Sequence, residues 1–349
     1  MMPNRHARAA LLGDYLPGVA ICGALLAGLI WLPSDNRLPM EILLVFAMAQ
    51  GWNLLSGYAG LLSFGHQVFI GIGAYSLFMS MNAFGLPLPL ALGVAGLVTM
   101  ATAAVMALFL HRMRDAYFSI GIWVMADCVR LLIGQWDWVG SSRGVMLESS
   151  KLDLTHFADM VFWLAIGLAV VVQFGVFILL RSRFGLGLMA TRDNDVAAAS
   201  VGIGASRSKV TALILSALIC GLGGAVYYLS ILYADPSGAF DLSWQIKILF
   251  IVIIGGVGTL EGPILGTALY FVLQQAFQDN GEMFLLLQGL TAIVVMVFAP
   301  QGIWGVIAQR TGLQIFPTRR RPPGPSLAAR RPKPTTEDKA QAARAPAKG

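Results

Sequence analysis

Long apolar runs constrain the fold of this chain more than any other feature of its sequence. A helix needs about 20 apolar residues to cross the hydrocarbon of a bilayer. Ten runs approach that length, and several are short or interrupted by glycine: Leu16–Leu32, Met40–Leu55, Leu61–Met81, Leu86–Leu110, Tyr117–Gly134, Phe157–Leu180, Val210–Leu232, Trp244–Val257, Ile264–Phe277 and Phe284–Phe298. Charged residues make up only 12% of the chain, against about 25% in a soluble globular protein. The sequence therefore predicts an all-α polytopic membrane protein with about ten transmembrane helices, some of them short or broken.

The basic residues predict the orientation of these spans, because cytoplasmic loops carry the excess of Lys and Arg. With the N-terminus inside, ten spans also place residues 181–209 and the C-terminal tail inside. Only Arg37, Arg143 and Lys151 then fall in outside loops. We expect both termini to be cytoplasmic, on a multi-pass protein of the bacterial inner membrane.

The chain divides by composition into a transmembrane domain, residues 1–310, and a tail, residues 311–349. The tail is basic, rich in Pro and Ala, and has few apolar residues to bury, so we expect it to be disordered. Its arginines could contact anionic membrane lipid or serve only to fix topology. Because the net charge of +6 comes largely from this tail, it does not indicate a nucleic-acid partner.

No constellation of enzymatic groups is present in the sequence. Histidines are scattered, no paired carboxylates recur, and Cys22, Cys128 and Cys220 all lie within apolar runs without metal-ligand spacing. The glycine-rich phosphate loop G-x-x-x-x-G-K-[ST] does not occur either. We therefore expect no catalytic residue, no metal and no cofactor, so any energy from ATP must come from a separate subunit.

A polar stretch from Arg181 to Lys209 separates two of the long apolar runs. We expect Asp193 to cap a short helix that runs through Ala199 and ends at Gly202, where glycine permits a left-handed exit. Its alanines are too small to build a core, but they let the surface of another protein approach closely. The stretch is typical of a docking element on the cytoplasmic face.

A glycine-rich segment, Gly57–Tyr75, reads GYAGLLSFGHQVFIGIGAY and embeds Ser63, His66 and Gln67 in apolar sequence. Glycine lets membrane helices approach closely. An unwound segment is tolerated only where it is buried in protein or lines a water-filled cavity. We favour a lining of a translocation path; the alternative is close helix packing, with these polar side chains hydrogen-bonded between helices.

A second glycine cluster, Ile253–Gly266, reads IIGGVGTLEGPILG. Glycines at every fourth residue would form one flat face on a continuous helix, but Pro263 favours a turn between two spans. We therefore expect close packing around a tight cytoplasmic turn, where Glu261 could also meet the partner of the docking stretch.

Charged and aromatic residues in the middle of the chain suggest two further features. Asp127 and Arg130 lie three residues apart in one span, so they share a helical face and are expected to pair with each other. Trp136 and Trp138 begin the outside loop 135–156. They suit either an anchor at the membrane interface or a contact surface for an external protein that delivers a solute.

Four stretches resemble the membrane permease subunits of branched-chain amino acid ABC importers, in particular the larger of the two permeases. They are residues 57–75, 117–144, 181–203 and 253–266, within a resemblance that covers roughly residues 40 to 300. The resemblance implies a helical permease fold without its own nucleotide site. It also implies a second permease, cytoplasmic ABC ATPase subunits and a periplasmic solute-binding protein as partners.

Candidate residues follow from the stretches described above and, for the coupling segment, also from the resemblance. The segment that couples to the ATPase would contain Asp193, Asp195, Ala197, Ala198 and Gly202. The substrate path would include Ser63, His66, Gln67, Tyr75 and Tyr117. Packing and turn residues would be Gly255, Gly256, Gly258, Gly262 and Gly266.

The solute stays open at this point. Branched-chain or other hydrophobic amino acids are expected, whereas Gln67 and the sequence VGSSRG at 139–144 depart from the family pattern. Related permeases carry urea, short amides or sugars, and an ion-coupled transporter working alone is a further alternative. A membrane-embedded enzyme would need paired catalytic groups, which the sequence does not supply.

Overall fold

The computed structural model describes residues 37–110, 113, 115–148, 156–277, 280–311 and 315–316. These residues are almost entirely helical. The membrane-length and shorter inner helices are α2 (Arg37–Asn53), α3 (Gln67–Asn82), α4 (Leu88–Leu110), α5 (Asp115–Gln135), α6 (Phe157–Arg181), α9 (Ala205–Ile231), α11 (Leu242–Gly255), α12 (Gly262–Ala276) and α13 (Gly281–Phe298). The remaining elements are the π-helix η1 (Leu54–Tyr58), the 3₁₀ turns η2 (Asp137–Val139) and η3 (Ser141–Arg143), the strands β1 (Val145–Met146) and β2 (Tyr233–Ala234), and the helices α7 (Arg183–Asp193), α8 (Asp195–Ser200), α10 (Pro236–Ala239) and α14 (Gly302–Thr311).

The prediction of a helical polytopic membrane protein is confirmed. Within the described residues, seven helices or helix pairs are long and apolar enough to cross a membrane. Nine of the ten predicted spans coincide with helices, although α3 and α12, with 16 and 15 residues, are shorter than a typical span. The remaining predicted span, Leu16–Leu32, and the tail from Pro317 lie outside the described residues, so the count of ten and the disorder of the tail stay predictions.

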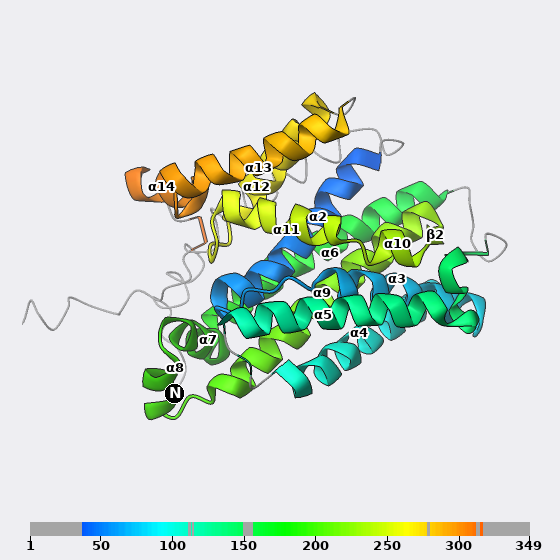
Figure 1. Ribbon diagram of the computed structural model, residues 1–349, viewed down its shortest axis with the longest axis horizontal. Helices are drawn as coiled ribbons and strands as arrows, with labels where there is room; N and C mark the ends of the chain where they lie inside the picture. Colours follow the sequence, from blue (N-terminus) through cyan, green and yellow to red (C-terminus); the bar gives the residue numbers. More distant parts are fainter. Residues whose placement is uncertain are drawn as a thin grey trace, which may run out of the picture. The chain divides into compact units, whose positions relative to one another are not determined.

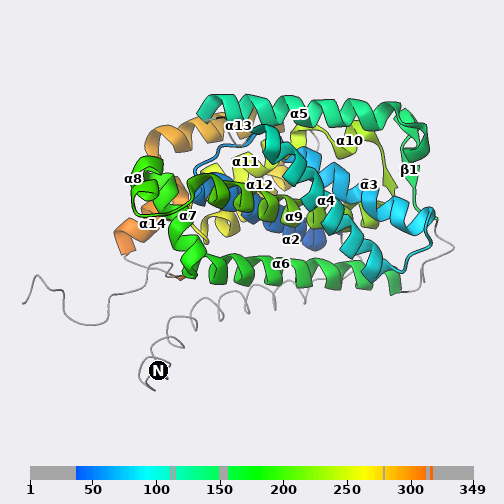
Figure 2. The same ribbon diagram turned by 90° about the horizontal axis from the view of Figure 1, so that it is seen from below.

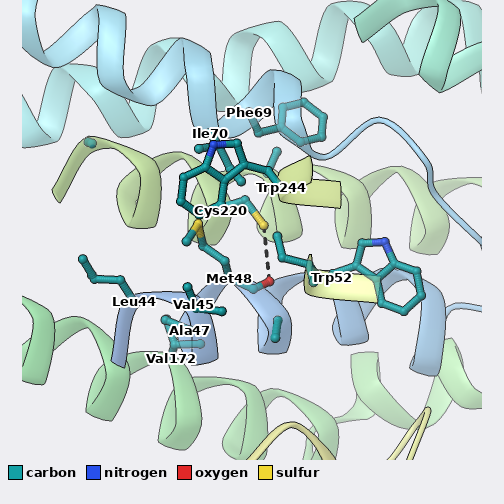
Figure 3. Packing of buried hydrophobic residues seen from close by; sticks show 14 of the residues in the cluster. Leu44, Val45, Ala47, Met48, Trp52, Phe69, Ile70, Val172, Cys220 and Trp244 are labelled. Atoms are coloured by element: carbon teal, nitrogen blue, oxygen red, sulfur yellow. Dashed lines mark hydrogen bonds between the residues drawn. The ribbon is translucent and has the colours of Figure 1, made fainter. Parts of the chain in front are cut away.

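Helix α2 lies at the centre of the bundle and packs against α6, α9, α11 and α12 (Figures 1 and 2). The apolar side chains of α2 are buried on nearly every face, because these neighbouring helices cover it on all but one side. Figure 3 shows this core, where Met48 of α2 lies next to Cys220 of α9, and Val172 of α6 lies on the other side of α2. The thiol of Cys220 donates to the carbonyl oxygen of Met48 at 3.5 Å. Cys220 is therefore a buried core residue, whereas Cys128 on α5 is exposed.

Helices α3 and α9 approach each other through glycine. A Cβ placed on Gly73 would collide with the backbone oxygen of Gly221, and one placed on Gly224 would collide with the backbone of Ile70. In a membrane the hydrophobic effect does not hold two helices together, so close backbone contact and dispersion must do so. The glycines of the first cluster downstream of His66 thus serve helix packing.

The two ends of the long helices carry different elements. Helices α7, α8 and α14 lie at one end, whereas the antiparallel ladder of β1 and β2 lies at the other (Figures 1 and 2). That ladder joins the loop after α5 to the loop after α9, and Leu147 extends it by donating to the carbonyl oxygen of Leu232 at 2.9 Å. The helix pair α7 and α8 therefore lies at one end of the protein, and a small two-stranded ladder lies at the other.

Candidate functional site

The polar stretch 181–209 forms two short helices, α7 and α8, in place of the single short helix expected. Asn194 is the N-cap of α8, and its side-chain oxygen accepts from the N–H groups of Val196 and Ala197 at 3.0 Å each. The prediction that Asp193 caps this helix is wrong by one residue. Asp193 is the last residue of α7 and its carboxylate pairs with Arg192 at 3.2 Å, whereas Asn194 has the extended backbone that a cap requires.

The exposed surface of α8 is apolar. The side chains of Val196 and Val201 are 76% and 74% exposed, and Ala197 is exposed beside them. Ala198, by contrast, is buried against the chain, so of the two predicted coupling alanines only Ala197 faces outward. Gly202 has a φ of 85°, which confirms the left-handed exit. We call Val196, Ala197 and Val201 the α8 surface.

Two polar contacts hold this element onto the bundle. Asp195 accepts from the ammonium of Lys209, at the start of α9, at 2.6 Å. Arg192, which the sequence reasoning did not select, donates from Nη1 to the carbonyl oxygen of Gly57 at 2.9 Å. The two residues of that second contact are 135 positions apart, so no local pattern in the sequence could have shown it.

The two glycine clusters and α7 converge around Arg192. The aliphatic part of the Arg192 side chain lies against Gly60, and its guanidinium lies against Gly258. Gly57 and Gly258 also face each other so closely that a Cβ on Gly57 would overlap the backbone of Gly258. A displacement of α7 must therefore move Arg192 against both clusters at once. We call Arg192, Gly57, Gly60 and Gly258 the arginine junction.

The first cluster is helical only in part. Helix α2 widens into the π-helix η1, and the chain is then irregular from Gly60 to Gly65 before α3 begins at Gln67. A π-helical turn is rare and frequently marks a functional position. The predicted span Leu61–Met81 is therefore helical only from Gln67 onward, because the chain leaves the helix from Gly60 to Gly65.

A buried hydrogen-bond network ties this irregular segment to α2 and α9. Ser216 donates to the carbonyl oxygen of Gly51 at 2.6 Å, so its oxygen is left to accept from Nε2 of His66 at 2.7 Å. His66 Nδ1 then accepts from the hydroxyl of Ser63, also at 2.7 Å. Both ring nitrogens of His66 are thereby used, and the imidazole is neutral with its proton on Nε2.

Side chains from α11 and α2 satisfy the backbone of the same segment. Gln245 accepts from the N–H of His66 at 2.9 Å and donates to the carbonyl oxygen of Ser63 at 2.9 Å. Trp52 donates to that same oxygen at 2.9 Å. Unwound backbone at membrane depth costs several kcal/mol for each unsatisfied group, which explains why an amide and an indole are buried here.

The predicted path residues fall into three environments. Ser63 and His66 are fully buried and take part in the network described above. Gln67 and Tyr75 are also buried, and within the described residues no hydrogen bond reaches Gln67 Oε1 or the Tyr75 hydroxyl. Tyr117 lies on α5 with 78% of its side chain exposed, so the structure does not bring it together with the others.

An open cleft lies beside the irregular segment, between it and α5. It has a volume of about 630 Å³ and is lined by Gly60, Leu62, Phe64, Ser119 and Trp123, among others. The hydroxyl of Ser119 donates to the carbonyl oxygen of Leu62 at 2.6 Å. The cleft is thus lined on one side by the irregular segment, whose Leu62 carbonyl is bound by α5.

The second cluster forms the expected turn. Helix α11 ends at Gly255, α12 begins at Gly262 with Pro263 in its first turn, and glycine backbones pack against each other across the pair. Asn53 closes the turn, since its side chain accepts from the N–H of Gly258 and donates to the carbonyl oxygen of Thr259, both at 2.8 Å.

Within the second cluster, Gly255, Gly262 and Gly266 lie where a side chain would strike backbone. Gly256 and Gly258 have φ angles of 134° and 73° in the turn itself. Glu261 is buried and accepts from the N–H of Phe316 at 2.7 Å, and burial raises the pKa of its carboxyl. It therefore faces the chain rather than an approaching partner.

Two other predictions can be compared with the structure. Arg130 and Asp127 pair at 2.9 Å on α5, as the spacing predicted. Trp136 and Trp138 are both exposed at the end where β1 and β2 lie, with ring centroids 6.1 Å apart. Among the described residues, His, Cys, Asp and Glu side chains do not gather in a group that could hold a metal.

Comparison with known proteins gives consistent results. The family described as the permease component of branched-chain amino acid transport systems matches residues 40–299. The permease proteins LivM of the high-affinity branched-chain amino acid transport systems of Salmonella typhimurium and Escherichia coli are 26% and 27% identical over 285 and 280 residues. In both cases the match covers 72% of this chain and 66% of the relative, so the chain spans about two thirds of their length.

A more distant relative comes from an archaeon. The probable branched-chain amino acid transport permease protein LivH of Methanocaldococcus jannaschii is 22% identical over 259 residues, which cover 67% of this chain and 80% of that protein. No solved structure matches the chain significantly.

Proposed function

Because the chain belongs to the family of permease components of branched-chain amino acid transport systems, we propose that it is a membrane permease subunit of an ABC importer and that α7 and α8 form its dock for a cytoplasmic ATPase. The observation that carries this proposal is the α8 surface. Val196 and Val201 are among the most exposed apolar side chains of the protein, although they lie in a stretch rich in charge. Exposed apolar side chains next to small ones are typical of a surface that another protein covers.

The position of this element supports the same conclusion. Helices α7 and α8 lie at one end of the long helices (Figures 1 and 2), together with Arg181, Arg183, Arg207 and Lys209. Basic residues favour the cytoplasmic side, where ATP is available. We therefore place this end, and both termini, in the cytoplasm of a cell with the protein in its inner membrane.

The arginine junction supplies a route from the dock to the interior. If an ATPase moves α7, Arg192 carries that motion to the carbonyl oxygen of Gly57 in η1 and to the turn at Gly258. The first of these contacts is a direct hydrogen bond of 2.9 Å from the Arg192 guanidinium. The irregular segment that follows η1 is then the part of the protein placed to open or close a path.

The cleft beside the irregular segment supports a second permease as partner. Its lining is almost entirely apolar and is built on one side by irregular chain that includes Gly60, Leu62 and Phe64. Irregular backbone is tolerated there only if protein or an aqueous path covers it. We place the substrate path between this face and a second permease subunit, with Ser63, His66 and Gln67 behind it.

The solute proposed is a branched-chain or other hydrophobic amino acid. It rests on family membership and on the apolar lining of the cleft, which includes Leu62, Phe64 and Trp123. Urea, short amides and sugars are the alternatives within related importers. At the end opposite α8, the exposed Trp136 and Trp138 are placed to meet a periplasmic solute-binding protein.

Charged substitutions on the α8 surface test the docking proposal. We expect the double variant Val196→Asp, Val201→Asp to insert normally but to lose ATPase subunits from a co-purification. Met146→Asp is the matched control, since Met146 is equally exposed, at 72%, but lies in β1 at the other end. Undiminished co-purification with the double variant, or an equal loss with the control, would refute the dock.

A further inference from the structure

A long apolar groove runs between α2, α6 and α12. Its volume is about 510 Å³, and its lining recurs at one-turn intervals on each helix, for example at Leu38, Ile42 and Phe46 of α2. On α12 the lining extends from Ile264 to Gln275, a distance of about 16 Å at the rise of 1.5 Å per residue. The groove therefore runs along these helices and is as long as a helix of about three turns.

This groove is the one face of α2 that the described residues leave uncovered. Beyond Arg37, the only partly exposed residues of α2 are Leu38, Glu41, Ile42 and Phe46. Glu41 pairs with Lys247 of α11 at 3.2 Å, and the other three line the groove. A segment that packs beside α2 must therefore use this groove, because α6, α9, α11 and α12 occupy the remaining faces.

Two buried polar groups on the groove lack partners among the described residues. Gln173 and Thr267 are each only 2% exposed, both line the groove, and neither Gln173 Nε2 nor Thr267 Oγ1 makes a hydrogen bond there. The orientation of Gln173 is fixed. Gln50 must donate to the carbonyl oxygen of Leu260 at 2.7 Å, and the same nitrogen donates to Gln173 Oε1 at 2.6 Å. The Gln173 amide nitrogen and the Thr267 hydroxyl are themselves enclosed beneath the groove, so the surface that an occupant meets is almost entirely apolar.

We propose that residues 16–32 of this same chain, which lie outside the described residues, occupy the groove as a helix antiparallel to α2. Only residues 33–36 connect this apolar run to the start of α2. A connection of that length makes two helices antiparallel neighbours, and the groove is the open place beside α2.

The sequence of the run fits the lining. Ala20, Ala24 and Gly28 are spaced by four residues, with Gly23 and Ala27 next to them, so one face of the helix carries only small residues. The groove presents large side chains such as Phe46 and Phe174 to that face.

Disulfide cross-linking in the full chain tests this proposal. The background carries Cys22→Ser, Cys128→Ser and Cys220→Ala, with a protease site inserted in the loop 149–155. Val170→Cys places a thiol in the groove, whereas Val171→Cys, one residue along α6, places it in a separate cleft formed with α4 and α9. Each is combined in turn with Ala20→Cys, Ala24→Cys and Ala27→Cys and oxidised in membranes.

We expect at least one pair with Val170→Cys to hold the two proteolytic fragments together on a non-reducing gel, and the matching pair with Val171→Cys to release them. Val272→Cys, on the α12 side of the groove, provides a second position if Val170→Cys disturbs folding. Failure of every groove pair, equal cross-linking at Val171→Cys, or a product with the mass of two chains would overturn the proposal. The last of these outcomes would assign the groove to a second copy.

Discussion

The two glycine clusters are alike in sequence but differ in structure. Both contain Gly-x-x-Gly-x-Leu, at 57–62 and 255–260. The first cluster contains an unwound segment, Gly60–Gly65, that is bound by buried side chains from α2 and α11, and it continues into the closely packed helix α3. The second is a tight turn between two helices that pack backbone to backbone. Glycine allows both outcomes, and the polar residues nearby decide which one forms.

Their neighbours explain the difference. Ser63 and His66 lie inside the first cluster and find partners on other helices, so the chain there can leave the helix without losing hydrogen bonds. Pro263 and Thr259 lie inside the second cluster, where Pro263 starts α12 and Thr259 bonds within the turn. The first cluster therefore depends on distant residues for its shape, and the second depends on its own Pro263 and Thr259 together with one distant residue, Asn53.

The largest expected effect concerns glycines that pack backbone to backbone. We expect Gly73→Leu in the first cluster and Gly266→Leu in the second each to destabilise the protein by about 3 kcal/mol or more. The reason is that each new side chain would strike a backbone carbonyl, of Gly221 and Ile251 respectively. Thermal unfolding in detergent measures this loss.

Gly175→Leu on α6 is the control for both variants, since a Cβ there meets nothing within 4 Å. Its effect should stay within about 0.5 kcal/mol. If Gly266→Leu were as mild as Gly175→Leu, the second cluster would not be a packing site and the contrast between the clusters would fail.

The second-largest expected loss of stability concerns the side chains that hydrogen-bond each cluster, His66 in the first and Asn53 at the second. We expect His66→Ala to cost about 3 kcal/mol, because it leaves a cavity and removes the acceptor of the Ser63 hydroxyl, while Ser216 keeps its bond to Gly51. Asn53→Ala should cost about 2 kcal/mol, because it removes the acceptor of the Gly258 N–H.

Hydrogen exchange distinguishes these two variants by position. His66→Ala should accelerate exchange from Gly60 to Gly65, and Asn53→Ala should accelerate it from Gly256 to Glu261. Acceleration in both segments with either variant would mean that the clusters respond as one unit.

Much of the fold follows from the sequence. Nine predicted spans coincide with helices because an apolar run of that length has few alternatives in a membrane. The turn at Pro263 and the pair of Asp127 and Arg130 follow from local spacing. The cap was misplaced because Asp193 and Asn194 are adjacent and both residue types cap helices well.

The contacts that shape the site could not be predicted in this way. Gln245 reaches Ser63 across 182 positions, and Asn53 reaches Gly258 across 205. Such partners are chosen by the packing of whole helices, and a single sequence contains no signal for them. The π-helix η1 and the role of Arg192 were missed for the same reason.

Substitution of Arg192, where both clusters meet, is expected to lower stability only slightly and to lower transport more. Arg192→Lys keeps the positive charge but loses the fork that reaches Gly57. We expect it to cost about 1.5 kcal/mol or less, since the contact is one hydrogen bond to a partly exposed cation. ATPase subunits should remain bound while ATP-driven uptake in proteoliposomes falls.

Arg183→Lys is the matched control for this variant, because Arg183 is exposed at the start of the same helix. Its uptake should equal that of the unmodified protein. Normal uptake with Arg192→Lys would show that the two clusters do not receive motion through this junction.

The smallest expected effect isolates the dock from both clusters. Asn194→Ala removes the acceptor for the N–H groups of Val196 and Ala197, which should cost about 1 kcal/mol. Asp193→Ala removes only an exposed ion pair with Arg192 and should change stability by less than about 0.5 kcal/mol. Hydrogen exchange in α8 should rise with the first variant alone, while exchange in the two clusters stays unchanged. A rise in the clusters as well would mean that α8 and the arginine junction fold together, and the dock would then be part of the same unit that holds both glycine segments.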